Sequence, residues 1–214
     1  MQIIYLPATI RTLVFDIDLT LYDSRPYYDN QHELLITRLA EHLNVTVAEA
    51  ETAVTQIRTD YAQQHGGRSL SLGNAFVQLG VPIAINAQWR AALFQPEAYL
   101  LRDEKLIATM KRLSNKYLIA AVTNNATIIG VRTLNALGVA DYFAPVIGLD
   151  ISDVSKPDIR PFQMVCTAHG IALSEAVSIG DRMAVDIELP LQHGMGGILV
   201  ESLADIYRLP AILL

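Results

Sequence analysis

Residues 13–20 have the sequence Leu13-Val14-Phe15-Asp16-Ile17-Asp18-Leu19-Thr20, an apolar run that ends in two carboxylates and a hydroxyl. The run predicts a buried strand. Because side chains alternate along a strand, Asp16 and Asp18 should start on the same side as the chain leaves the sheet. Each carboxylate is costly to bury unpaired, and a divalent cation is the simplest group that offsets their repulsion. The same pattern also suits a loop in which both carboxylates are solvated or cap a helix.

The composition predicts a folded globular protein with no nucleic acid polymer as a partner. Of its 214 residues, 51% are hydrophobic and 18% are charged, and 16 basic residues against 22 acidic ones give a net charge of −6. Binding nucleic acid needs a basic face, whereas a small anionic substrate is compatible with an acidic chain. The single cysteine, Cys166, excludes an internal disulfide and lies in an apolar stretch that predicts a buried thiol.

The sequence also predicts no association with a membrane. Residues 1–7 lack the basic leader and the long apolar core of a signal peptide, and no apolar run approaches the length that spans a membrane. We therefore expect a cytoplasmic protein, which suits a lone reduced cysteine. Both a monomer and a homodimer remain open.

Two kinds of pattern divide the chain. Residues 23–97 have helix-period apolar spacing, and Thr46 with Glu49 forms a predicted capping box for a helix that ends near Gln64. Further cap helices are expected at Tyr28–His42, Leu72–Leu79 and Ala87–Phe94. Residues 98–214 alternate strands and helices, which predicts an α/β fold with a parallel sheet covered on both faces. Strands are expected at Tyr117–Thr123, Tyr142–Leu149, Ala176–Ile179 and Gly197–Val200, and helices at Asp103–Ser114, Ile128–Leu137 and Pro161–His169.

The expected strand ends carry side chains with a chemical use. In chain order these are Asp16 and Asp18, Thr123 and Asn124, Lys156, and Asp181 and Asp186. Such strand ends meet at the ligand-binding edge of a parallel sheet. The carboxylates suit Mg²⁺, Thr123 and backbone N–H groups near Asn124 suit phosphate oxygens, and Lys156 suits a nucleophilic carboxylate and phosphoryl charge. Each residue alone can be a helix cap or a solvated side chain, but their coincidence favours a functional site.

The motifs resemble the four motifs of the haloacid dehalogenase (HAD) superfamily: Asp16-x-Asp18-x-Thr20, Thr123-Asn124, Lys156-Pro157 and Gly180-Asp181-x-x-x-x-Asp186. The resemblance implies a Rossmann-like three-layer α/β/α core of residues 1–22 and 98–214, with a small α-helical cap of residues 23–97 inserted after the first motif. It also implies phosphoryl transfer through an aspartyl-phosphate. Asp16 matches the nucleophile, Asp18 the general acid and base, and Lys156 the charge-stabilising lysine.

The same resemblance implies Mg²⁺ as the cofactor and a small phosphorylated metabolite as the partner. The metal ligands would be Asp16, the backbone carbonyl of Asp18, and Asp181, with Asp186 in support. Thr123 matches the phosphate-binding hydroxyl, beside Asn124. The acid at Asp18 favours a phosphatase over a dehalogenase, because a halide leaves without a proton. One departure is Leu19, which stands where Gly or Asn is usual and places the local turn in question.

Several finer assignments stay open. Residues 15–22 and 205–210 are similar to the pyrimidine 5′-nucleotidase branch, which would make a nucleoside monophosphate the substrate, whereas phosphoglycolate phosphatase and phosphomutase branches share the cap type. Two other classes are a phospho-acceptor signalling module, whose known examples lack the helical insertion, and a catalytically silent binding protein. Candidates for substrate contact in the cap, where a surface or packing role is commoner, are Arg25, Tyr27, Tyr28, His32 and Arg68. Trp89 is expected in the cap core.

Overall fold

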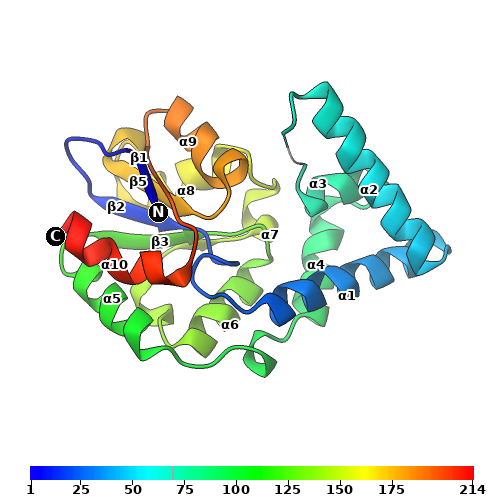
Figure 1. Cartoon of the computed structure of the whole chain (residues 1–214), viewed down its shortest axis with the longest axis horizontal. Coiled ribbons are helices and arrows are strands. Elements are labelled where there is room, and N and C mark those ends of the chain that lie inside the picture. The colour runs from blue at the N-terminus through cyan, green and yellow to red at the C-terminus, as the bar shows by residue number, and fades with distance from the viewer. Residues whose placement is uncertain (69) are drawn as a thin grey trace.

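The computed structural model describes residues 1–68 and 70–214. Within them, six strands form one sheet in the order β1-β6-β5-β2-β3-β4 (Figure 1). The strands are β1 (Gln2–Tyr5), β2 (Thr12–Phe15), β3 (Leu118–Val122), β4 (Val146–Ile147), β5 (Ala176–Gly180) and β6 (Gly196–Leu199). Strands β2 to β6 are parallel, and β1 is antiparallel to β6 at one edge. The predicted parallel α/β sheet is confirmed, with an antiparallel edge strand that the sequence did not predict.

Helices cover both faces of this sheet. They are α5 (Glu104–Ser114), α6 (Thr127–Leu137), α7 (Leu149–Ser152), α8 (Arg160–His169), α9 (Glu188–Gln192) and α10 (Leu203–Leu213), with the 3₁₀ turns η2 (Ala140–Tyr142) and η3 (Leu173–Glu175) and the π-helical segment η4 (Met183–Ile187). The alternation along β2 separates two cores: Leu13 and Phe15 pack with α5, α6 and α10, while Val14 packs with α8 on the opposite face. Cys166 is buried in the second core. The core domain therefore has three α/β/α layers.

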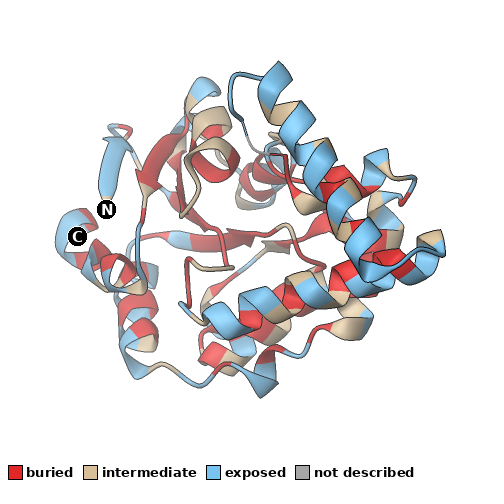
Figure 2. Cartoon of the chain, turned by 45° about the vertical axis from the view of Figure 1, so that its right-hand side comes forward, coloured by how far each residue is buried: buried red, intermediate tan, exposed pale blue. Residues whose placement is uncertain are grey.

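Four helices form a group beside the carboxyl ends of the strands (Figure 1). They are α1 (Arg25–Leu43), α2 (Val47–Gln64), α3 (Leu72–Gln78) and α4 (Ile83–Leu93), followed by η1 (Pro96–Ala98). The capping box of Thr46 and Glu49 is confirmed at the start of α2. Trp89 is buried against Phe76 in the apolar cluster of this cap. Figure 2 shows buried and exposed residues interleaved along α1, whereas α2 is largely exposed.

The cap and the core share one apolar cluster. Ala126, Ile129 and Leu149 come from the core domain but belong to the same buried cluster as the cap residues. Helix α4 makes this connection, because it packs on both α6 and α7. Helix α4 is therefore anchored on the core, and Tyr27 of α1 likewise belongs to a buried cluster of core residues.

Several elements differ from the sequence predictions. The strand expected at Tyr142–Leu149 is reduced to β4, because η2 precedes it and Leu149 already begins α7. Helix α4 begins at Ile83, directly after Pro82, rather than at Ala87. Helix α10 was not predicted, since it contains Pro210, a residue that normally argues against a helix interior. No helix among the described residues combines the length and apolar character needed to cross a membrane.

Candidate active site

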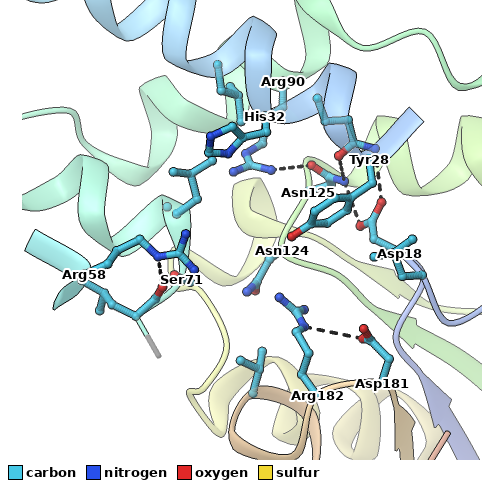
Figure 3. A pocket seen from close by; sticks show the side chains of 17 residues that line it. Asp18, Tyr28, His32, Arg58, Ser71, Arg90, Asn124, Asn125, Asp181 and Arg182 are labelled. Atoms are coloured by element: carbon cyan, nitrogen blue, oxygen red, sulfur yellow. Dashed lines mark hydrogen bonds and ion pairs between the residues drawn. The ribbon is translucent and has the colours of Figure 1, made fainter. Parts of the chain in front are cut away.

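A cavity of about 160 Å³ lies between the cap and the carboxyl ends of the strands (Figure 3). Its core wall includes Asp18, Asn124, Asp181 and Arg182. Its cap wall includes Tyr28 and His32 from α1, Arg58 from α2 and Arg90 from α4. The cavity thus brings together side chains that are far apart in the sequence and that come from both domains.

Lys156 connects two buried carboxylates, Asp16 and Asp186, and none of these three residues is among those that line the cavity. Its Nζ donates to Oδ1 of Asp16 and to Oδ1 of Asp186, each at 2.7 Å, and to the carbonyl of Val122 at 2.9 Å. Burial disfavours the charge of Lys156, but the two carboxylates outweigh burial and raise the pKa of the ammonium group. Burial also raises the pKa of Asp16 to about 7, against the opposing effect of Lys156. The lysine therefore stays charged and holds Asp16 in place.

Three carboxylates form a cluster that fits a hard cation. Oxygen atoms of Asp16, Asp181 and Asp186 all lie within 4.8 Å of one another. Oδ1 of Asp181 is buried and has no hydrogen-bond partner in the described part of the chain, and burial raises the pKa of this carboxyl. An orphaned carboxylate oxygen beside two further acids is the donor set that Mg²⁺ prefers. The Asp18 side chain is not part of this cluster and has other partners.

A guanidinium group faces the same cluster. The side chain of Arg182 lies 3.5 Å from Asp181 Oδ1, 3.6 Å from Asp186 Oδ2 and 3.9 Å from Asp16 Oδ2. These distances exceed those of hydrogen bonds, so the attraction is electrostatic. The three carboxylates therefore create a strongly negative site that attracts the guanidinium of Arg182. Arg182 also lines the cavity (Figure 3), where a guanidinium suits a phosphoryl oxygen.

Glycine is required at the end of β5. A Cβ on Gly180 would lie 2.5 Å from the Cβ of Asp186, closer than carbon atoms approach. Any larger residue would push Asp186 away from Lys156 and out of the acidic cluster. The glycine next to Asp181 in the fourth motif thus has a packing function at the site.

Asp18 receives four hydrogen bonds from residues around the cavity. Oδ1 accepts from the Tyr22 hydroxyl at 2.7 Å and from Gln31 Nε2 at 3.4 Å. Oδ2 accepts from Asn125 Nδ2 at 2.9 Å and from the Thr123 hydroxyl at 3.2 Å. These donors fix the carboxylate in the wall of the cavity, where it is partly accessible.

The second motif is placed at the site, but its two residues make different contacts. Thr123 is buried, donates to Asp18 and accepts from the backbone N–H of Asn125. Asn124 lines the cavity. Its side-chain oxygen accepts from the backbone N–H of Lys156 at 2.7 Å, and its side-chain nitrogen donates to the backbone carbonyl of Lys156 at 3.2 Å. The Asn124 amide therefore positions the lysine segment, a function that the sequence did not predict.

Most residues of the cap wall were not predicted from the sequence. Among its cap candidates, Tyr28 and His32 line the cavity, whereas Tyr27 is fully buried. The guanidinium of Arg25 lies over the ring of Tyr28, and Arg68 lines a separate surface pocket. No sequence motif marks Gln31, Arg58 or Arg90 as a cavity residue, because each lies at an ordinary position within a helix. Arg182 directly follows Asp181 of the fourth motif, and the sequence analysis assigned it no function.

The sequence is similar to a hydrolase family and to proteins described as phosphatases. Residues 10–194 match the model of the haloacid dehalogenase-like hydrolase family. The chain is 25% identical over 193 residues to a glyceraldehyde 3-phosphate phosphatase of Methanocaldococcus jannaschii, covering 87% of this chain and 82% of the relative. It is 28% identical over 202 residues to a phosphoglycolate phosphatase of Caulobacter vibrioides, covering 88% and 78%.

Solved structures show the same fold. A HAD phosphatase from Thermococcus onnurineus matches with a TM-score of 0.60 and 20% identity over 95% of this chain and 98% of that one. A 2-haloacid dehalogenase from Pseudomonas syringae matches with a TM-score of 0.57 and 24% identity over 96% and 98%. Because the family model spans residues 10–194, which is most of the chain, the chain belongs to the haloacid dehalogenase-like hydrolase family.

Proposed function

We propose that this hydrolase is a Mg²⁺-dependent phosphatase that acts on a small phosphomonoester through an aspartyl-phosphate on Asp16. The observation that carries the proposal is the Lys156–Asp16 contact of 2.7 Å, with two more acids beside it and a cavity above. The relatives described as phosphatases support the reaction class. The helical insertion α1–α4 favours a hydrolase over a phospho-acceptor signalling module.

In the first step, a carboxylate oxygen of Asp16 attacks phosphorus and forms a new P–O bond. The bond from phosphorus to the leaving oxygen breaks, and its electron pair stays on that oxygen. Asp18, in its protonated form, gives its proton to the leaving oxygen as the alcohol departs. Lys156 stabilises the charge of Asp16 and of the transferring phosphoryl group.

In the second step, water attacks the phosphorus of the aspartyl-phosphate. Asp18 is now a carboxylate and takes a proton from this water. The P–O bond to Asp16 breaks, which restores the Asp16 carboxylate and releases inorganic phosphate. Asp18 thus acts first as acid and then as base, which requires that its position between donors be well defined.

The residues that would hold Mg²⁺ are Asp16 and Asp181, with the backbone carbonyl of Asp18, and Asp186 would support them. When bound, the cation neutralises phosphoryl charge and repulsion among the carboxylates. Thr123 and the backbone N–H groups near Asn124 would bind phosphoryl oxygens.

The cavity favours a small substrate with a second negative group. Its volume of about 160 Å³ is well below the about 300–1,000 Å³ typical of sites for drug-sized ligands, which favours a short leaving group over a nucleoside. Arg58 lines the cap wall, and its Nε donates to the carbonyl of Leu70 at 3.1 Å. A guanidinium held there suits a carboxylate or a second phosphate on the leaving group.

The test is phosphate release from a panel of small metabolite phosphates, nucleoside monophosphates and aryl phosphates, with Mg²⁺ and with EDTA. We expect release that depends on Mg²⁺ and is fastest for small anionic substrates. Mass spectrometry of acid-quenched protein should show one added phosphoryl group on Asp16. An Asp16→Asn variant that stays folded and active would overturn the assignment.

A further inference from the structure

The structure links cap helix α4 to Asp18 through a chain of buried side chains. Arg90 Nη1 donates to Asn125 Oδ1 at 2.6 Å, and Asn125 Nδ2 donates to Asp18 Oδ2 at 2.9 Å. Arg90 is 7% exposed and Asn125 is 3% exposed. On the far side, Arg90 Nε donates to Asn86 Oδ1 at 2.6 Å, and Asn86 is fully buried.

The donor pattern determines which way the Asn125 amide points. A guanidinium only donates, so the Asn125 atom that faces Arg90 has to be the oxygen. The amide nitrogen of Asn125 is then forced to face Asp18 Oδ2 and Gln31 Oε1, the latter at 3.2 Å. Without Arg90, the amide can turn by half a rotation and place an oxygen against the carboxylate.

Arg90 is held rigidly because the helix that carries it, α4, is packed against the core. Helix α4 packs on α6 and α7, and its apolar cluster includes core residues. Asn86 lies one turn before Arg90 on the same helix and fixes the guanidinium from behind. Burial lowers the pKa of Arg90 to about 10, at which the group is still charged near neutral pH. Removing one partner would therefore leave buried polar groups unpaired.

We propose that Arg90 is a positioning residue that, through Asn125, orients Asp18 for proton transfer to the leaving group. This inference rests on the proposed function, since it assigns a task within that reaction. Among the described residues, Arg90 makes no hydrogen bond to Asp18 itself and reaches it through Asn125. Its effect is transmitted by the orientation of one amide, and it should be confined to the steps in which Asp18 moves a proton.

Two aryl phosphates of nearly equal size separate proton transfer from binding. The nitrophenolate of p-nitrophenyl phosphate leaves without a proton, whereas the more basic phenolate of phenyl phosphate needs help from Asp18. First-turnover release of each phenol, measured by rapid quench with Mg²⁺, reports the first step alone. For Arg90→Met we expect about 10- to 100-fold slower release from phenyl phosphate and a change within about 3-fold for p-nitrophenyl phosphate.

Matched variants test the path through Asn125. Asn125→Ala should show the same selective loss, and the Arg90→Met/Asn125→Ala double variant should be no slower than Asn125→Ala alone. The control is Arg38→Met, a cap arginine whose side chain is 45% exposed and pairs with Glu41. It should leave both release rates unchanged. Additive losses in the double variant would show that Arg90 does not act through Asn125.

The outcomes keep the two proposals apart. Mg²⁺-dependent turnover and phosphorylation of Asp16 in the wild-type protein test the proposed function, whereas the ratio of variant to wild-type release for the two substrates tests the positioning role. Arg90→Met could slow the release of both phenols equally while the amount released in the first turnover stays the same. That result would show a merely structural role and overturn the inference. If Arg90→Met fails to fold, the shorter polar variant Arg90→Gln provides the ratio instead.

Discussion

Lys156 donates a hydrogen bond of 2.7 Å to Asp16, and both side chains are 1% exposed. The same ammonium group donates to Asp186, so one buried cation compensates two buried anions. Such an arrangement contributes little net stability compared with an apolar core, but breaking it leaves charges without a partner. The contact therefore makes Lys156 important for stability as well as for the proposed chemistry.

Replacing Lys156 by Met should destabilise the metal-free protein by about 3–5 kcal/mol at about pH 8. At about pH 5 the loss should be smaller, because Asp16, whose pKa burial raises to about 7, is then largely protonated and needs less counter-charge. Urea unfolding in EDTA at both pH values measures this. Lys111→Met, at an exposed position of α5, is the control and should change little. An equal loss at both pH values would contradict the electrostatic explanation.

The raised pKa of Asp16 predicts how stability depends on pH without metal. Burial raises it from 3.8 to about 7, so the folded protein binds more protons than the unfolded chain between these values. The contribution of Asp16 is then fully present below about pH 4 and is lost as pH rises through about 7. Since each pKa unit corresponds to about 1.4 kcal/mol, the loss is at most about 4 kcal/mol.

Asp16→Asn cannot ionise and should remove this dependence. In EDTA, the free energy of unfolding of the variant relative to wild type should increase between about pH 5 and about pH 8. Urea titrations at several pH values give the slope. Asp29→Asn, whose side chain is 67% exposed in the wild type, serves as the reference. Parallel pH profiles for wild type and Asp16→Asn would show that Asp16 ionises normally in the fold.

The acidic cluster predicts that Mg²⁺ stabilises the folded protein. A cation bound only by the native state adds about 2.7 kcal/mol at 100 times its Kd, which corresponds to a rise in Tm of several degrees for a chain of this size. Asp181→Asn removes a carboxylate whose Oδ1 has no hydrogen-bond partner among the described residues, so the rise should shrink strongly. Thermal unfolding with increasing Mg²⁺ tests this, and equal shifts in both proteins would place the ion elsewhere.

Much of the site could be predicted because strand order determines where polar residues meet. Asp16, Thr123 and Asp181 each follow a buried strand, and the parallel register of β2 with β3 and β5 aligns these strand ends. The helical insertion was visible from its 3.6-residue periodicity. These features are local patterns or follow from one topological rule.

The rest depended on contacts between distant residues. Arg90 and Asn125 are 35 positions apart; Asn125 directly follows the second motif, but nothing near Arg90 in the sequence marks it as its partner. Strand β1 was not predicted, because Ile3, Ile4 and Tyr5 are 42–50% exposed at the sheet edge and its residues do not alternate between buried and exposed positions. Only packing of the cap on the core decides which cap side chains reach the cavity.

Leu19 has a φ of 59°, in the left-handed region that disfavours residues with a Cβ. The unusual residue noted in the first motif thus occupies a strained turn beside the site. Leu19→Ala and Leu19→Gly remove the same packing, but only glycine also removes the strain. We expect Leu19→Gly to be more stable than Leu19→Ala by about 1 kcal/mol. Urea unfolding gives the difference, and the order common in helices, with alanine more stable, would contradict the left-handed turn.

Arg58 predicts a preference for substrates with a second negative group. Replacing it by Gln keeps a polar side chain but removes the charge, so binding of an anionic leaving group should weaken by about 1.5–3 kcal/mol, or roughly 10- to 100-fold in kcat/KM. The measurement compares kcat/KM for phosphoglycolate with that for ethyl phosphate, which has no carboxylate. Only phosphoglycolate should suffer, mainly through KM. Thr59→Ala, at the exposed neighbouring position, is the control. Equal losses on both phosphates would mean that Arg58 supports the cap and does not recognise the leaving group.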